Sequence, residues 1–478
     1  GHGTAGSGGT IANKTGADGS TSTGIGIYLN STADVQLDRM QLNNFQNFAI
    51  RGFNVNGFIL ANSTINTTSG VNGDNGGVDE GSVVFGDFLN ASLSGLSGTV
   101  NITNSVIANG IEDNFRVVNH SGSMTFNMSG STIRDNSTVS PGNEGLLLQA
   151  EGSASMTIDI QNSSFLRNRA NGVHVINQST GTVNVDIGAP GAAGSGGTFT
   201  DNTLGVNING NKSGATNFNI LNATFTVPNF PTLYGAGGAS SQININLGGA
   251  AVVAERGAMT GNIIGNSIDT NLSPSGPAVR IIANGTDNTG GNVITFKLDS
   301  NNITGGENRG IDILTRDGNA GINATITNNI VTTNDGPLIA DNGALNAIFV
   351  VAGATATAAG TLVPDSGFVN LDLAGNNAEA PDGISVFDVR IRQRFNTTYR
   401  LEDYAGSASD DAAVTAYLAA RNPATTGPET FTADHNTGGA PNGSAGFLNI
   451  ADVPEPPAPL LVAPGGGVTY FGDTQVLN

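Results

Sequence analysis

The sequence predicts an all-β solenoid, a stack of coils that each contain two or three short strands. Two observations lead to this prediction: the composition and an internal repeat. Of the 478 residues, 69 are Gly and 60 are Asn, whereas only 12% are charged. Such a low charge does not fit a helix-rich protein, whose exposed helical faces need Lys, Glu and Arg. A hydrophobic content of 38% is enough to bury a core, so we expect strands and turns rather than disorder.

The repeat consists of an apolar residue, any residue, Asn, two small polar residues and a large apolar residue. Because Asn and Gly both tolerate a left-handed backbone, their exchange at the third position predicts a sharp turn with positive φ. In a stack of coils these residues would form a turn ladder bonded through side-chain amides, and the large apolar residues would form an inner core stack. The turn ladder comprises Asn62, Asn104, Gly130, Asn162, Asn222 and Asn328, and the core stack comprises Ile65, Ile107, Ile133, Phe165 and Phe225.

A second strand signal follows most copies of the repeat. It is a Gly followed by alternating apolar residues, as in residues 172–175 (GVHV) and 205–208 (GVNI). Adjacent turn positions such as 104 and 130 are 26 residues apart, which fits one coil of three short strands. Longer intervals contain Gly- and Asn-rich inserts, which are typical of loops projecting from a solenoid.

These registered repeats resemble those of the right-handed parallel β-helix proteins, over about residues 24–341. That family includes bacterial surface and autotransporter-like adhesins, pectate-lyase-like enzymes and phage tailspikes. The resemblance implies a right-handed parallel β-helix as the fold, and it leaves the activity open.

The repeat also suggests how the chain is divided. We expect a Gly-, Ser- and Thr-rich N-terminal edge (1–23), the parallel β-helix (24–345), a small C-terminal cap or junction (346–450), a Pro- and Gly-rich linker or strap (451–467) and a strand-like tail (468–478). One short helix is predicted in the cap, from Asp410 to Arg421, with Ser409 as its N-cap. Its apolar side chains would cover the open end of the solenoid.

Several classes of function are disfavoured. A net charge of −20 with only three Lys argues against nucleic acid as a partner. No apolar run reaches the roughly 18 residues of a transmembrane segment. The chain has no Cys, and its four His residues lack the spacing of a zinc site.

Two sets of charged residues are candidate sites. Arg134, Asp135 and Arg167 follow the apolar position of successive repeats, so their side chains could converge on stacked coils. The resemblance to lyases of this fold, which use an arginine as a base, implies a catalytic role. The simpler interpretation is that these charges neutralise one another.

Asp74, Asp79 and Glu80 lie in one Gly-rich insert, and their carboxylates are suitable ligands for a structural Ca²⁺. The alternative is an ordinary solvated acidic loop. No other cofactor is expected.

The function that best fits these features is a secreted or cell-surface structural protein, such as an adhesin, an extracellular fibre or an envelope-layer component. Self-association and binding to cell-surface polysaccharide are the expected interactions. The alternatives are a polysaccharide lyase or glycoside hydrolase of the same fold, or a phage tailspike. Aromatic residues are only 6% and Trp is absent, which counts against the stacking surfaces of a sugar-cleaving cleft.

Overall fold

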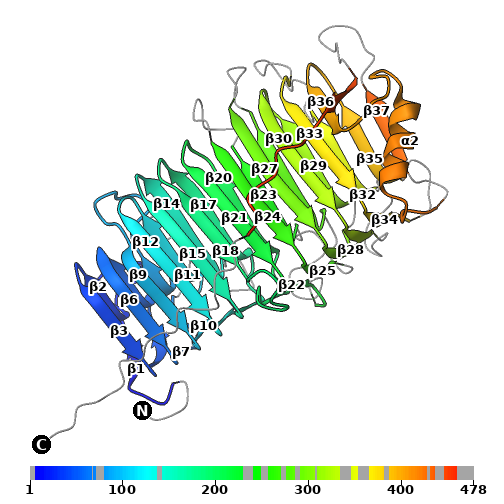
Figure 1. Ribbon diagram of the computed structural model, residues 1–478. Coiled ribbons are helices and arrows are strands. Elements are labelled where there is room, and N and C mark those ends of the chain that lie inside the picture. Colours follow the sequence, from blue (N-terminus) through cyan, green and yellow to red (C-terminus); the bar gives the residue numbers. More distant parts are fainter. Residues whose placement is uncertain are drawn as a thin grey trace, which may run out of the picture.

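The chain forms an elongated stack of coils, with the sequence running from one end to the other (Figure 1). The computed structural model describes residues 6–66, 68–70, 80–136, 143–229, 241–248, 257–270, 276–285, 291–306, 309–333, 346–353, 365–381, 387–427, 431–435 and 446–459.

Three parallel sheets run along the stack, and the chain visits them in turn on each coil. Sheet A has 12 strands, and sheets B and C have 13 each. At about 4.8 Å between neighbouring strands, the 12 spacings of a 13-stranded sheet make a rod about 58 Å long.

Sheet A contains the shortest strands. They are β1 (Thr10–Lys14), β4 (Gln41–Phe45), β7 (Thr64–Ile65), β10 (Val106–Ala108), β13 (Thr132–Arg134), β16 (Ser164–Leu166), β19 (Thr198–Thr200), β22 (Thr224–Thr226), β25 (Ser267–Thr270), β28 (Asn302–Gly305), β31 (Ile330–Thr332) and β34 (Asn377–Glu379).

Sheet B follows sheet A on each coil. Its strands are β2 (Ile25–Asn30), β5 (Phe48–Phe53), β8 (Gly81–Phe85), β11 (Asp113–Asn119), β14 (Leu146–Gly152), β17 (Asn171–Ser179), β20 (Leu204–Gly210), β23 (Ile243–Leu247), β26 (Val279–Asn284), β29 (Arg309–Arg316), β32 (Asn346–Ala352), β35 (Phe387–Gln393) and β37 (Phe431–His435).

Sheet C completes each coil. Its strands are β3 (Ala33–Asp38), β6 (Val55–Ala61), β9 (Leu96–Thr103), β12 (Ser123–Ser129), β15 (Ser155–Gln161), β18 (Val183–Ile187), β21 (Ala215–Leu221), β24 (Ala258–Ile264), β27 (Asn292–Asp299), β30 (Ala320–Thr327), β33 (Phe368–Ala374), β36 (Thr398–Glu402) and β38 (Phe447–Ile450).

This architecture confirms the predicted fold class, an all-β parallel solenoid with a short C-terminal helix. The solenoid does not end at residue 345, however, because β32 to β38 continue all three sheets through the region 346–450. The sequence repeat is no longer recognisable there, but the turn conformation is retained. Gly375 occupies the turn position with φ +69°. Strand β1 likewise places part of the expected N-terminal edge in sheet A, paired with β4.

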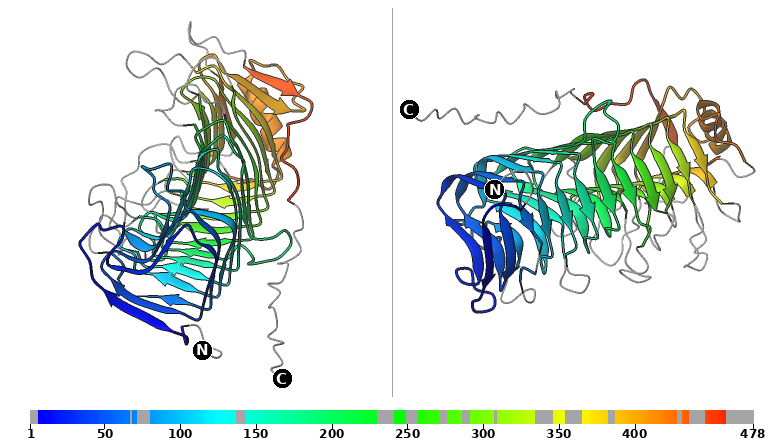
Figure 2. Two further views of the ribbon diagram at one scale, coloured as in Figure 1. Left: turned by 90° about the vertical axis from the view of Figure 1, so that its left-hand side faces the viewer. Right: turned by 90° about the horizontal axis from the view of Figure 1, so that it is seen from below.

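The helix α2 (Asp411–Arg421) lies at the C-terminal end of the rod, as Figures 1 and 2 show. Its N-cap is Asp410 rather than Ser409, because the Asp410 carboxylate accepts a hydrogen bond from Ala413 N at 3.0 Å. Val414 and Leu418 are fully buried, so the helix covers apolar side chains of the last coils.

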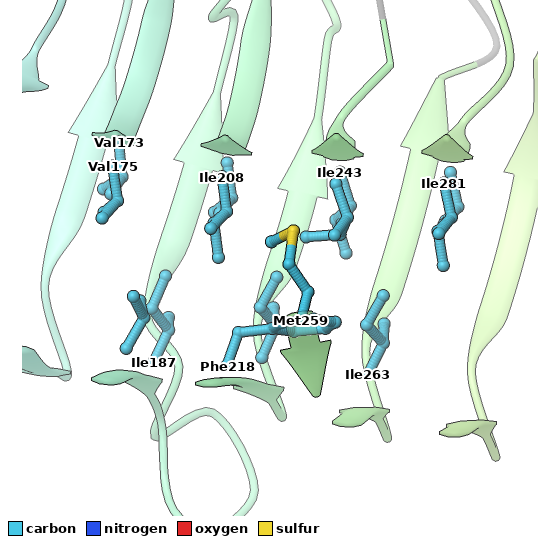
Figure 3. Packing of buried hydrophobic residues seen from close by; sticks show 14 of the residues in the cluster. Val173, Val175, Ile187, Ile208, Phe218, Ile243, Met259, Ile263 and Ile281 are labelled. Atoms are coloured by element: carbon cyan, nitrogen blue, oxygen red, sulfur yellow. The ribbon is translucent and has the colours of Figure 1, made fainter. Parts of the chain in front are cut away.

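The core lies between the sheets and is built by in-register stacking. Figure 3 shows Val175, Ile208 and Ile281 of sheet B facing Ile187 and Ile263 of sheet C. Every second side chain of a strand points inward, so one buried column repeats from coil to coil.

The predicted core-stack residues all lie in sheet A with 0% exposure: Ile65, Ile107, Ile133, Phe165 and Phe225. Phe199 lies between Phe165 and Phe225, with ring centroids 4.9 and 4.6 Å away.

After β38 the chain turns back along the rod, and we call residues 451–459 the strap. Figure 1 shows it as a dark red trace crossing sheet C. Three contacts hold it: Val453 N donates to Glu402 Oε2 at 2.9 Å, Lys297 Nζ lies 3.2 Å from Glu455 Oε2, and Asn262 Nδ2 donates to Pro457 O at 3.0 Å. Residues 460–467 of the predicted linker and the predicted tail 468–478 lie outside the described residues.

Candidate functional site

The predicted turn residues all occupy one corner of the coil, between sheets C and A. Each has a positive φ, from 47° at Asn104 to 57° at Gly130. The asparagine side chains among them are exposed or half-buried. Three of them bond to different groups on the preceding coil: Asn62 to Asp38, Asn222 to Ala189 O and Asn328 to Asp299. These residues therefore shape the turn without bonding to one another as a ladder.

The hydrogen-bonded ladder lies one residue further along the chain. In the N-terminal half it consists of serines: Ser63 N donates to Ser105 Oγ and Ser105 N to Ser131 Oγ, both at 3.1 Å. In the C-terminal half it consists of buried asparagines, in which each Nδ2 donates to the next Oδ1 at 2.9–3.0 Å. These are Asn266, Asn301, Asn329, Asn376 and Asn422. The predicted register was thus wrong by one residue, because a buried amide needs partners on both sides whereas the turn residue needs only positive φ.

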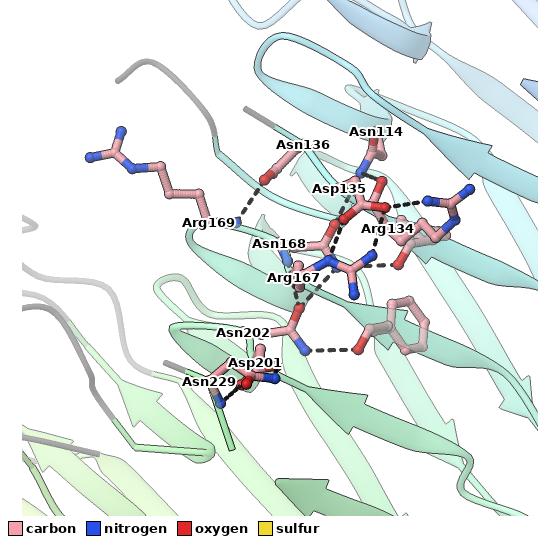
Figure 4. Close-up of polar contacts among 12 residues, drawn as sticks. Asn114, Arg134, Asp135, Asn136, Arg167, Asn168, Arg169, Asp201, Asn202 and Asn229 are labelled. Atoms are coloured by element: carbon pink, nitrogen blue, oxygen red, sulfur yellow. Dashed lines mark hydrogen bonds and ion pairs between the residues drawn. The ribbon is translucent and has the colours of Figure 1, made fainter. Parts of the chain in front are cut away.

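A second buried amide column lies at the corner between sheets A and B (Figure 4). Asn114 Nδ2 donates to Asn168 Oδ1 at 3.0 Å, Asn168 Nδ2 to Asn202 Oδ1 at 2.9 Å, and Asn202 Nδ2 to Phe165 O at 2.9 Å. We did not predict this column from the sequence, although an Asn three residues beyond the large apolar residue of two repeats could have indicated it.

The candidate catalytic residues lie beside this column and do come together. Asp135 accepts hydrogen bonds from Arg167 Nε at 2.5 Å and Arg167 Nη2 at 2.9 Å, and it also pairs with Arg134 (Figure 4). Partial burial tends to raise the pKa of Asp135, but the hydrogen bonds from the two arginines outweigh it and lower the pKa. A carboxylate held ionised between two guanidinium groups is a poor general acid. The geometry favours mutual neutralisation.

A separate cluster of buried acids and a histidine lies on sheet B. Asp113 is 2% exposed, and its carboxyl group is hydrogen-bonded to that of Glu144. Glu144 Oε1 lies 3.0 Å from His174 Nδ1 and accepts from Asn171 Nδ2 at 3.0 Å. The other ring nitrogen, His174 Nε2, lies 2.8 Å from Asn209 Nδ2.

Burial, followed by the neighbouring Glu144 charge, raises the pKa of Asp113 well above its usual range. For Glu144, burial is outweighed by the hydrogen bond and charge of His174, and the pKa is lowered. The opposite shifts mean that a proton on this pair is held by Asp113 rather than by Glu144. A glycosidase pair stands about 5–9.5 Å apart, so hydrogen-bonded carboxyls leave no room for the reacting sugar and water.

The predicted calcium site is only partly described. Asp74 and Asp79 lie outside the described residues. Glu80 is fully buried, and its Oε1 accepts a hydrogen bond from Gly19 N at 2.9 Å. In the ranges that the structure describes, no three His, Asp or Glu side chains are grouped to hold a metal ion.

The outer face of sheet C carries two continuous polar columns. In the first, Asn127 donates to Asn101 at 2.9 Å, Asn219 to Asp186 at 2.7 Å and Asn262 to Asn219 at 2.8 Å. The second contains Thr99, Thr125, Thr157, Asn184, Asn217, Thr260, Thr295, Asn323 and Asn370, paired coil by coil. From Thr99 to Asn217 the result is a flat, accessible surface of amide, hydroxyl and carboxylate groups repeated every coil, about 4.8 Å apart. Further along the columns Asn262, Asn323 and Asn370 are buried, and Asn262 bonds to the strap.

A groove of about 220 Å³ interrupts this face where three remote parts of the chain meet. Asp159 and Asp186 form its floor, Pro190 comes from the loop after β18, and Pro459 ends the strap. Burial, with the neighbouring charge of Asp186, raises the pKa of Asp159. The groove therefore offers hydrogen-bond acceptors beside small apolar walls.

No family model, no curated protein and no solved structure matches this chain. Across the described ranges, no helix has the length and apolar character needed to cross a membrane.

Proposed function

We propose that this chain is a secreted or cell-surface structural protein that attaches to its surroundings through the outer face of sheet C. The observation that carries this proposal is the pair of polar columns, because their groups repeat regularly along the rod. An extended partner with a regular repeat, such as a cell-surface polysaccharide, can meet equivalent groups on successive coils.

Sugar hydroxyl groups can donate to Asp159 and Asp186 and accept from the asparagine amides of the same face. The groove beside these carboxylates supplies a place where one sugar unit contacts apolar walls. An adhesin, an extracellular fibre and an envelope-layer component all fit this arrangement, with self-association as a further expected interaction.

The sugar-cleaving alternative receives less support from the chemistry of the described residues. Asp135 is neutralised by Arg134 and Arg167, and the Asp113–Glu144 pair is too close for glycoside hydrolysis. The rod by itself does not favour a phage tailspike over other surface proteins.

The proposal is tested by measuring binding to insoluble and soluble polysaccharides with Asp186→Lys, which places a long cation in the middle of the first column. The matched control is Glu379→Lys, which makes the same charge change on the exposed part of sheet A. We expect Asp186→Lys to lose binding and Glu379→Lys to keep it. Depolymerisation of an acidic glycan by the protein, abolished by Asp135→Ala, would overturn the structural role.

Electron microscopy of native material supplies the second test. Filaments or a surface layer would support the fibre or envelope role. A freely soluble monomer that binds no glycan and no copy of itself would overturn the proposal.

A further inference from the structure

A cluster of arginines lies on the outer face of sheet B at the C-terminal end of the rod. We call it the arginine patch, and it comprises Arg280, Arg309, Arg390, Arg392 and Arg394. The strand register aligns Arg280 with Asp312, Asp312 with Phe349, and Phe349 with Arg390, so these residues form one column over four coils. Five of the 18 basic residues of a chain with net charge −20 are thus concentrated on one face.

The patch is built on an apolar base that also faces outward from sheet B. The base consists of Ile282, Leu314, Phe349 and Val351, each no more than 7% exposed. The guanidinium carbon of Arg309 lies 4.1 Å from the centre of the Phe349 ring. Val351 is paired in register with Arg392. Arginine stems that pack on apolar side chains lose less entropy when their head groups bind a ligand.

Two carboxylates are paired with these guanidinium groups among the described residues. Asp312 lies 2.7 Å from Arg309 and 3.5 Å from Arg280, and Asp434 lies 2.7 Å from Arg390 and 3.3 Å from Arg392. Five positive charges against two negative ones leave a local excess of three within the described part of the patch.

Burial and the crowding of like charges both act on Arg392. Burial, followed by the charges of Arg394 and Arg390, lowers the pKa of Arg392 to about 10. The buried Nε of Arg309 donates no hydrogen bond within the described structure, and the Nε of Arg392 makes an ion pair with Asp434 at 3.3 Å without hydrogen-bond geometry. Both features would be relieved by an anion with several acceptor oxygens.

We propose that the arginine patch is a binding site for a phosphate group, either free inorganic phosphate or a phosphate monoester carried by a partner. A phosphate monoester has a charge of about −1.5 to −2 near neutral pH and three acceptor oxygens, which suits several convergent guanidinium groups. This site lies on sheet B, away from the polar columns of sheet C, so it does not depend on the proposed attachment role.

The first experiment measures binding of sodium phosphate by calorimetry, with sodium chloride at the same ionic strength as the reference. The double variant Arg392→Ala/Arg394→Ala should weaken phosphate binding at least about tenfold, because each charge-assisted hydrogen bond contributes strongly. Arg39→Ala is the matched control, since Arg39 is paired with Asp38 on the N-terminal coils. Arg392→Lys keeps the charge without the planar fork and should lose part of the affinity.

Two further probes distinguish the source of the phosphate group: glucose 6-phosphate for a phosphorylated sugar, and vesicles containing phosphatidic acid for a lipid headgroup. The site is supported if the wild type binds any of the three probes and the double variant does not. The probe that the wild type binds most strongly identifies the source of the phosphate group. The absence of binding to all three, or equal binding by the double variant with unchanged circular dichroism, would overturn it.

Discussion

Replacing Asn329 by Ala tests whether the buried amide ladder, rather than the turn residue beside it, stabilises the coils. Asn329 is 1% exposed and makes four side-chain hydrogen bonds. Its Nδ2 donates to Leu298 O and to Asn376 Oδ1, both at 2.9 Å. Its Oδ1 accepts from Asn301 N at 3.0 Å and from Asn301 Nδ2 at 2.9 Å.

The substitution leaves Asn301 N–H buried without its acceptor, which costs about 1–3 kcal/mol. The other three lost bonds contribute about 0.5–1.5 kcal/mol each, but Asn301 Nδ2 and Asn376 Oδ1 retain other partners. We therefore expect the free energy of unfolding to fall by about 3–5 kcal/mol.

The matched control is Asn328→Gly, the adjacent residue with φ +56° and an exposed side chain. Because Gly adopts this backbone without strain, the control should stay within about 0.5 kcal/mol of the wild type. A solenoid can unfold in parts, so urea denaturation should be accompanied by hydrogen exchange over residues 295–335. Equal losses in the two variants, or a loss below about 1 kcal/mol in Asn329→Ala, would refute the reasoning.

Substitutions at three further residues test the core and the charged clusters. Phe199→Ala opens a cavity in the sheet A ring stack and should cost about 3–5 kcal/mol in urea unfolding, whereas Phe199→Leu should cost less than about 1.5 kcal/mol. The raised pKa of Asp113 means that the wild type loses stability as pH rises from the unfolded-state pKa through the folded-state value. Asp113→Asn should therefore flatten this dependence above the unfolded-state pKa, and a steeper loss of stability with rising pH in the variant would contradict it. The lowered pKa of Asp135 adds stability above the unfolded-state pKa that is lost as pH falls through the folded value. Asp135→Asn should therefore destabilise the protein at neutral pH but not in acid below the folded-state pKa.

The turn position could be predicted from the sequence because Asn and Gly share a conformational preference. The exchange at Gly130 indicates positive φ without any knowledge of neighbouring coils. The ladder position is harder to find, since its occupants change from Ser63 and Ser105 to Ala223 and then to Asn266. Serine hydroxyls and asparagine amides accept from the buried backbone donor of the neighbouring coil, and Ala223 has no acceptor, so no single residue type marks the column.

The end of the solenoid was misplaced for a related reason. Coils beyond residue 345 keep inward apolar residues such as Val350 and Leu371, but long inserts separate their strands. A regular spacing therefore disappears from the sequence while the stacking persists. The buried acid–histidine cluster on sheet B was not predicted for a similar reason. Asp113, Glu144 and His174 are separated by 31 and 30 residues in the sequence, and only the coil register brings them together.

In this fold, the inward columns of side chains provide stability, whereas charged side chains on the outward columns are available for recognition. Charged side chains are excluded from the inward columns, because an unpaired charge there would be buried. The outward columns have no such restriction, and they differ along the rod: Asp159 and Asp186 occupy one region of sheet C, Lys297 continues the same column, and Arg390 and Arg392 crowd one end of sheet B. A net charge of −20 therefore describes the chain but not any one face, so the anionic partners that it disfavours overall remain compatible with the arginine patch.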